Sequence, residues 1–184
     1  MNWPNRLSIL RIALIPILVL MMYVDTGFSR VIALIVFLVA SFTDWLDGWM
    51  ARKYNIVTNF GKFLDPVADK LLVLSTMIAL CGQGLFPAWA CIVVLFRELA
   101  VDGLRLIAVE QGRVIAAGKL GKIKTSLQMV TLVLYLLSSC GATLFAPVAE
   151  IMMWAAVLMT VWSGVDYFVK NREVLHDGGS KPGV

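Results

Sequence analysis

Apolar residues along this chain gather into six long runs that are separated by short polar connections. A helix that crosses the hydrocarbon core of a membrane needs about 20 mostly apolar residues, and each run approaches or exceeds that length. The runs are Leu7–Val24, Val31–Met50, Pro66–Leu80, Leu85–Val109, Leu120–Cys140 and Pro147–Val169. The pattern predicts an all-α polytopic membrane protein with six transmembrane helices.

The runs take up most of the 184 residues, so residues 1–170 are predicted to form one membrane domain. The polar residues 171–184 are predicted to be a disordered cytoplasmic tail. The first run is longer than the apolar part of a signal peptide, a second run follows at once, and no small-residue cleavage pattern ends it. We therefore interpret it as a retained helix, with residues 2–5 as a short interfacial segment before it.

Charge is scarce, and its placement predicts the topology. Sixty per cent of the residues are apolar and 15% are charged, against roughly 25% charged in soluble domains. The net charge of +4 comes mainly from lysines and arginines at the N-terminus, in the second and fourth connections and at the C-terminus, whereas the other connections hold only Arg30. The positive-inside rule then predicts a protein of the cell membrane with both termini in the cytoplasm, which requires an even number of spans. Basic residues that rim a membrane do not favour nucleic-acid binding.

Cysteine and histidine chemistry finds little support. Cys81, Cys91 and Cys140 lie in or at the ends of apolar runs without metal-ligand spacing, as small apolar residues do. The one histidine, His176, lies in the polar tail. Ser-His-Asp, Cys-His and histidine-based zinc chemistry are therefore disfavoured.

Four aspartates stand close together where the second run leads into the third. Asp44 and Asp47 are three residues apart and share one face of a helix. Asp65 precedes a proline, which predicts a helix that starts with Asp65 as its N-cap, and Asp69 follows one turn later. Two neighbouring helix ends would thus offer two carboxylates each.

Such a cluster requires cations. Each ionised carboxylate at membrane depth costs about 2.5–3.5 kcal/mol, and the carboxylates repel one another. Hard oxygen ligands favour Mg²⁺ or Mn²⁺, and four carboxylates suit a pair of ions that clamps the oxygens of a phosphoryl displacement. Gly48 would let a phosphate approach the helix closely, and Arg52 would supply a forked donor to its oxygens.

Each of these residues also has a structural interpretation. Asp65 could act only as a helix cap, Gly48 only as a close helix contact, and Arg52 only as a topological signal. Together these interpretations leave the other three aspartates uncompensated, so a metal and diphosphate site is preferred.

The segment from Asp44 to Asp69 reads D-x2-D-G-x2-A-R-x8-G-x3-D-x3-D, which matches in full the signature of the CDP-alcohol phosphatidyltransferases. The chain therefore resembles that family, which implies a six-helix fold and a homodimer. It also implies metal-dependent transfer of a phosphatidyl group from a CDP-linked lipid to an alcohol, with release of CMP. The resemblance implies that Asp44, Asp47, Asp65 and Asp69 bind the metal, and that Asp69 is also the catalytic base. The positions expected to contact CDP-diacylglycerol are Asp47, Gly48, Arg52 and Thr58.

The fourth run carries charges that concern the acceptor. Glu98, Asp102 and Arg105 form one helical stripe, which Arg97 flanks. Ion pairs within the helix are one interpretation. The nearby lysines 119, 122 and 124 put cations in excess, however, and this favours a second bound anion such as an acceptor's phosphate.

Three segments resemble the bacterial phosphatidylglycerophosphate synthase branch of the family: Asn5–Arg11, Arg97–Arg105 and Gly121–Thr125, with a weaker similarity at Ser163–Tyr167. The resemblance implies sn-glycerol 3-phosphate as the acceptor, bound by Arg97, Arg105 and Lys122. Asp102 stands where the branch commonly has threonine.

Other functions remain open from the sequence alone. Within the family, inositol phosphate or phosphatidylglycerol could be the acceptor. A transporter is a further alternative, although no pair of broken helices marks a binding site at mid-membrane.

Overall fold

The structure, a computed structural model, describes residues 3–24, 26–54, 59–116 and 118–176. Side chains are described for all of these except residues 3–6, 45, 47–54 and 59–63, for which only the backbone is described. Every regular element in the described residues is a helix, which confirms the all-α prediction.

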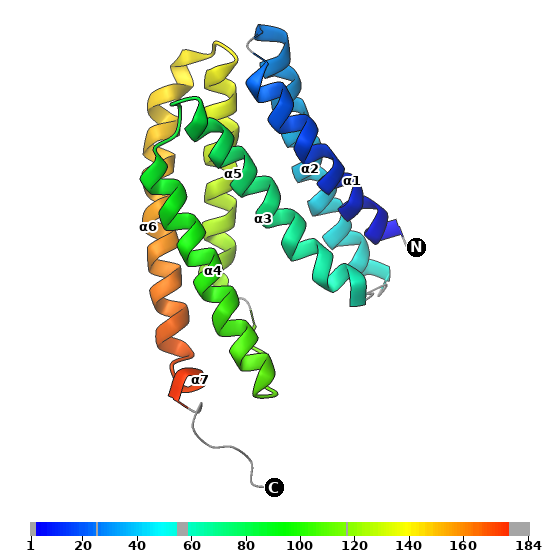
Figure 1. Cartoon of the computed structure of the whole chain (residues 1–184), viewed down its shortest axis with the longest axis vertical. Helices are drawn as coiled ribbons and strands as arrows, with labels where there is room; N and C mark the ends of the chain where they lie inside the picture. Colours follow the sequence, from blue (N-terminus) through cyan, green and yellow to red (C-terminus); the bar gives the residue numbers. More distant parts are fainter. Residues whose placement is uncertain (1–2, 25, 55–58, 117, 177–184) are drawn as a thin grey trace, which may run out of the picture.

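Six long helices dominate the described chain (Figure 1). They are α1 (Trp3–Tyr23), α2 (Gly27–Tyr54), α3 (Asn59–Gly82), α4 (Ala88–Glu110), α5 (Lys119–Ser139) and α6 (Ala146–Lys170). A 3₁₀ turn, η1 (Thr143–Phe145), precedes α6, and a short helix, α7 (Glu173–His176), follows it. Each long helix contains most of one predicted apolar run, because only an internally hydrogen-bonded backbone is stable in lipid.

The start of α3 differs from the prediction. The helix begins at Asn59, so Pro66 lies inside it and Asp65 is not its N-cap. The carboxylate of Asp65 instead accepts a hydrogen bond from Ser8 of α1, 2.5 Å away. A tertiary contact has thus taken the place of the local cap that the Asp-Pro pair predicted.

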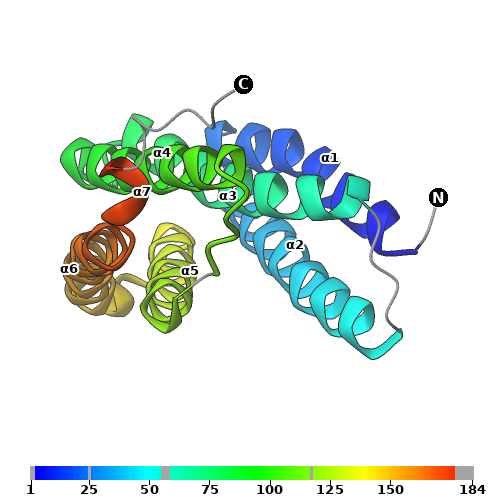
Figure 2. The ribbon, with the colours of Figure 1, turned by 90° about the horizontal axis from the view of Figure 1, so that it is seen from below.

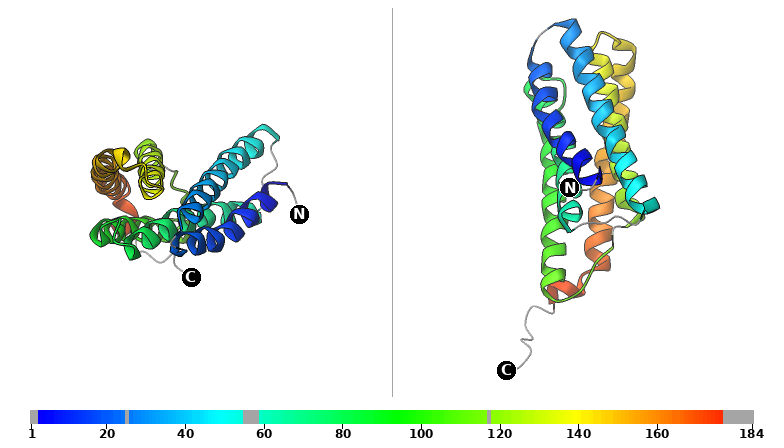
Figure 3. Two further views of the ribbon diagram at one scale, coloured as in Figure 1. Left: turned by 90° about the horizontal axis from the view of Figure 1, so that it is seen from above. Right: turned by 90° about the vertical axis from the view of Figure 1, so that its right-hand side faces the viewer.

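The helices form two groups of three, seen from below in Figure 2 and from above in Figure 3. In the first group α1 packs on both α2 and α3, and in the second α6 packs on both α4 and α5. The groups meet where α3 contacts α4 and α5 and where α2 contacts α5. Any site at that junction therefore receives side chains from both groups.

The ends of the bundle agree with the predicted arrangement of connections. The N-terminal end of α1, the α4–α5 connection and the end of α6 lie toward the lower end in Figure 1, with the end of α2 and the start of α3. The α1–α2, α3–α4 and α5–α6 junctions lie at the opposite end. The basic connections thus share one end of the molecule, although its side of the membrane stays a prediction.

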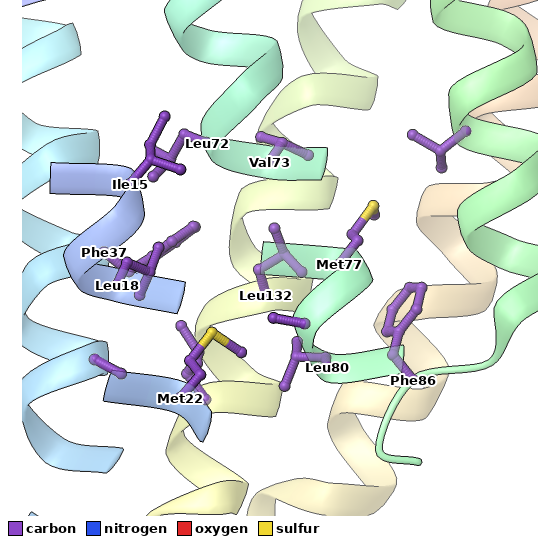
Figure 4. Packing of buried hydrophobic residues seen from close by; sticks show 14 of the residues in the cluster. Ile15, Leu18, Met22, Phe37, Leu72, Val73, Met77, Leu80, Phe86 and Leu132 are labelled. Carbon is purple, nitrogen blue, oxygen red and sulfur yellow. The ribbon is translucent and has the colours of Figure 1, made fainter. Parts of the chain in front are cut away.

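The main apolar core joins the two groups. Ile15 and Leu18 of α1, Phe37 of α2, Leu72 of α3 and Leu132 of α5 are buried together (Figure 4). Many large apolar side chains lie on the surface instead, such as Phe96 of α4 and Trp162 of α6. Exposure of this kind is typical of helices that face lipid.

Part of the predicted membrane topology is confirmed. Within the described residues, Gly27–Asp44, Lys119–Ser139 and Thr143–Lys170 are long and apolar enough to cross a membrane, and Leu7–Tyr23 is a shorter apolar helix. Helices α3 and α4 have the length of a span but carry several charged residues each. The count of six spans therefore stays a prediction, as does the interfacial position of the residues that begin α1.

A short helix follows α6. Residues 173–176, in the stretch predicted to be a disordered tail, form α7. Val174 is buried against Val101, Leu104 and Ala108 of α4, and its carbonyl accepts a hydrogen bond from Gln111. Burial of Val174 and this hydrogen bond both hold α7 against α4.

Candidate active site

Arg11 of α1 brings two of the predicted metal-binding aspartates together. Its side chain is fully buried, and its Nη1 atom lies 2.9 Å from Asp44 Oδ1 of α2 and 2.8 Å from Asp69 Oδ1 of α3. Both contacts are within ion-pair distance of one nitrogen, so the two carboxylates are neighbours. The arginine supplies part of the positive charge that a cluster of carboxylates in a membrane requires.

Ser8 holds the third described aspartate against the same helix. It lies one turn before Arg11 and donates its hydroxyl hydrogen bond to Asp65. Residues three apart share a helix face, so one face of α1 contacts three aspartates that lie more than 30 residues further along the chain. Ser8 and Arg11 belong to the Asn5–Arg11 motif, for which no role was predicted. Two polar residues on one face of an apolar run were the signal that could have indicated a buried polar contact.

The other residues predicted for the donor site are described less fully. Asp47, Gly48 and Arg52 lie in the last turns of α2, but their side chains are outside the described part of the structure. Thr58 lies outside the described residues altogether. The structure therefore brings together Asp44, Asp65 and Asp69 along α1 and does not test the predicted contacts with CDP-diacylglycerol.

The carboxylate oxygens of the aspartates are suitable ligands for a hard divalent cation. Asp44 and Asp69 retain 33% and 39% exposure of their side chains although each contacts the buried arginine, so oxygen atoms remain accessible. Among the side chains that are described, no group of three or more potential ligands is close enough to hold an ion. The fourth aspartate of the cluster, Asp47, is not among those side chains.

A cavity of about 310 Å³ connects this pair of aspartates to the predicted acceptor residues. Asp44 and Asp69 line it from α2 and α3, and residues of α4, α5 and α6 line the remainder. The lining includes all three predicted acceptor cations: Arg97, Arg105 and Lys122. Residues predicted from separate motifs for two different substrates thus lie around one space at the junction of the two helix groups.

The acidic residues of α4 are paired with neighbouring helices. Glu98 forms ion pairs with Lys124 of α5 and, at 3.8 Å, with Lys70 of α3, and Asp102 pairs with Lys70. Glu98 also lies 3.2 Å from Arg97 on its own helix. Sequence analysis did not assign Lys70 any role, because its partners lie about 30 residues further along the chain.

Arg105 is oriented by a hydrogen bond. Its Nε donates to the Tyr167 hydroxyl at 3.0 Å, and its guanidinium carbon lies 5.6 Å from the centre of that ring. The ion pairs within α4 that were one interpretation of its charged stripe do not include Arg105. Among the described residues, Arg105 and the exposed Lys122 form no ion pair. Both cations thus face the cavity with charge available for an anion.

The cavity combines carboxylates suited to a metal ion with cations suited to a phosphate, an arrangement that fits an enzyme of phosphoryl transfer. Comparison with known families agrees: the chain belongs to the CDP-alcohol phosphatidyltransferase family, whose profile matches residues 1–162. Members of this family are membrane-integral and generally depend on a divalent metal ion.

Individual relatives cover almost the whole chain. A CDP-diacylglycerol–glycerol-3-phosphate 3-phosphatidyltransferase of Bacillus subtilis (strain 168) is 46% identical, over 95% of this chain and 97% of the relative. The protein of the same name in Rickettsia bellii is 41% identical, over 91% and 93%. A probable phosphatidylglycerophosphate synthase of Mycobacterium tuberculosis (strain H37Rv) is 40% identical, over 92% and 81%.

Proposed function

We propose that the protein transfers the phosphatidyl group of CDP-diacylglycerol to sn-glycerol 3-phosphate, which yields phosphatidylglycerophosphate and CMP. The observation that carries the proposal is the single cavity lined by Asp44 and Asp69 on one side and by Arg105 and Lys122 on the other. The names of relatives that are 40–46% identical over nearly the full chain support the same reaction.

Asp69 is the proposed general base. It accepts the proton of an acceptor hydroxyl, whose oxygen forms a bond to the phosphorus of the phosphatidyl group. The bond between that phosphorus and the oxygen of CMP breaks, and CMP leaves. Asp69 can perform this step because it lines the cavity and its side chain is 39% exposed.

Metal binding is assigned to the aspartate cluster. Asp44, Asp47, Asp65 and Asp69 would hold Mg²⁺ or Mn²⁺, with two ions as the proposed number. Bound there, the metal neutralises charge on the diphosphate of the donor. Asp47, Gly48, Arg52 and Thr58 are proposed to contact CDP-diacylglycerol.

The balance of charge around the cavity favours an acceptor that carries phosphate. Lys124 and Lys70 are matched by Glu98 and Asp102, whereas Arg105 and Lys122 pair with no acidic group in the described residues. Arg97 shares its charge with Glu98. A phosphate monoester would supply the matching negative charge.

The proposed setting is the cell membrane, with six spans, both termini and the cavity on the cytoplasmic side, and a homodimeric assembly. The basic connections at one end of the bundle support this orientation.

The test is release of CMP from CDP-diacylglycerol by the purified protein, with each candidate acceptor in turn. We expect sn-glycerol 3-phosphate to support turnover far better than inositol phosphate, phosphatidylglycerol or glycerol. Faster turnover with another acceptor would replace the proposed one, and flux across sealed vesicles without CMP release would point to a transporter.

A further inference from the structure

Helix α6 contributes a short polar segment to the cavity, Ser163–Tyr167, that has no role in the reaction as proposed. Ser163, Asp166 and Tyr167 of this segment line the cavity. Two of them, Ser163 and Tyr167, accept hydrogen bonds from the arginines of α4. The segment therefore contacts two of the cations that are proposed to bind the acceptor, Arg97 and Arg105.

Each arginine has its own partner on α6. Arg105 Nε donates to the Tyr167 hydroxyl at 3.0 Å, and Arg97 Nη2 donates to Ser163 Oγ at 3.3 Å. Both partners are buried, with 2% exposure for Ser163 and 7% for Tyr167. A neutral partner fixes the direction of a guanidinium group and leaves its charge available, as holds for Arg105; Arg97 also lies 3.2 Å from the Glu98 carboxylate through its other terminal nitrogen.

Glycine provides the space for Arg97. A Cβ atom added at Gly164 would lie 3.1 Å from Arg97 Cγ, closer than ordinary van der Waals contact. A Cβ atom at Gly121 of α5 would lie 3.7 Å from Arg97 Nη2. The arginine thus passes between two helices at positions without side chains, and an alanine at Gly164 would push against its stem.

The hydrogen-bond partners on α6 are closer together along their helix than the two arginines are along α4. Arg97 and Arg105 are eight residues apart, about 12 Å along α4, whereas Ser163 and Tyr167 are four residues apart, about 6 Å along α6. Helices α4 and α6 run in the same direction, and the order of the pairs follows that direction (Figure 1). The two side chains therefore converge on a shorter stretch of α6 than the one their backbones span on α4.

We propose that Ser163, Gly164 and Tyr167 are positioning residues that aim Arg97 and Arg105 at one phosphate group of the acceptor. They do not bind the acceptor themselves. They set the affinity of the cavity for phosphate by fixing the geometry of the two arginines. The inference rests on the proposed function, since it takes the acceptor to carry a phosphate.

The alternative is a purely structural role. Tyr167 packs with Val101, Leu104 and Ala108, so its ring contributes to the apolar core regardless of its hydroxyl. Tyr167→Phe separates the two roles, because it keeps the ring and removes only the hydrogen-bonding oxygen. Tyr135→Phe is a matched control: this tyrosine packs edge-on against Phe86 and does not line the cavity.

The experiment measures KM for sn-glycerol 3-phosphate, KM for CDP-diacylglycerol, kcat and thermal stability for each purified variant. For Tyr167→Phe we expect the acceptor KM to rise about 3- to 10-fold, with donor KM and melting temperature close to those of the unaltered protein and of Tyr135→Phe. Gly164→Ala should raise the acceptor KM at least as much. Its control is Gly27→Ala, at a position with open space around the added Cβ.

The outcomes distinguish this inference from the proposed function. If the unaltered protein releases no CMP with sn-glycerol 3-phosphate, the proposed function fails. If the unaltered protein is active and Arg105→Ala impairs acceptor use, but Tyr167→Phe and Gly164→Ala leave acceptor KM unchanged, the positioning role is overturned and the function stands. A lower melting temperature with unchanged acceptor KM, or equal rises in both KM values, would also overturn it.

Discussion

Replacing Arg105 with alanine tests whether the cavity binds the acceptor through its phosphate. The structure limits what the change can do to stability, because the polar partner of this arginine among the described residues is Tyr167. Loss of one hydrogen bond and one cation–π contact should lower the free energy of unfolding by about 1–2 kcal/mol. Loss of a charge-assisted contact to phosphate should raise the free energy of the transition state by about 1.5–3 kcal/mol. That corresponds to a loss of roughly 10- to 100-fold in kcat/KM for sn-glycerol 3-phosphate.

The assay records CMP release while one substrate is varied and the other is held at saturation. We expect the loss in the acceptor's kcat/KM, with the KM for CDP-diacylglycerol little changed. Arg105→Lys should recover only part of it, because an ammonium group cannot reproduce the planar fork of a guanidinium. Arg30→Ala serves as the control, since Arg30 contacts the Ser139 carbonyl at the opposite end of the bundle. A less stable Arg105→Ala protein with normal acceptor kinetics would refute the phosphate site and leave the aspartate site standing.

Three further perturbations test the aspartates and the charge balance. Chelation should abolish turnover and Mg²⁺ or Mn²⁺ should restore it; full activity in a metal-stripped preparation would contradict the metal site. Asp69→Asn should lower kcat by about 10²–10⁴-fold or more while binding of CDP-diacylglycerol suffers less, and near-normal turnover would exclude Asp69 as the base. Asp102→Asn should lower the acceptor KM a few-fold, because the charge of Lys70 is then balanced only by Glu98, 3.8 Å away, and attracts the acceptor's phosphate more strongly. Adding Lys70→Ala should reverse that gain, and an unchanged KM in the single variant would show that the pair does not affect the acceptor.

The fold was predictable from sequence to the extent that local pattern determines it. Apolar runs of membrane length predicted all six long helices, since lipid leaves the backbone few alternatives to a helix. The predicted start of α3 was wrong because the Asp-Pro pair is only a local signal. In the structure Asp65 accepts a hydrogen bond from Ser8 of α1, which is distant in sequence. The helical turn at α7 depends on burial of Val174 against α4, which no local pattern indicates.

Candidate site residues could be predicted from the sequence where they belong to a motif of fixed spacing. The residues that pair with them could not be predicted. Asp44, Asp69, Arg97 and Arg105 were identified within single stretches of sequence, and they line one cavity. Their neutralising and orienting partners come from other helices, so only the tertiary structure reveals them. The stripe on α4 illustrates the difference. Helical spacing allowed ion pairs along the helix as one interpretation, whereas in the structure Glu98 and Asp102 also pair with lysines of α3 and α5.

The buried guanidinium of Arg11 between two aspartates has a consequence for how the enzyme is assembled. Because this positive charge belongs to the chain, α1, α2 and α3 can pack around the acidic cluster during insertion into the membrane, before any ion is captured. We therefore expect folding and binding of the proposed metal ions to be separate events, with the second reversible without undoing the first. A preparation stripped with chelator should therefore stay folded, with a melting temperature lowered only by the lost free energy of metal binding, and should regain activity when Mg²⁺ or Mn²⁺ is returned.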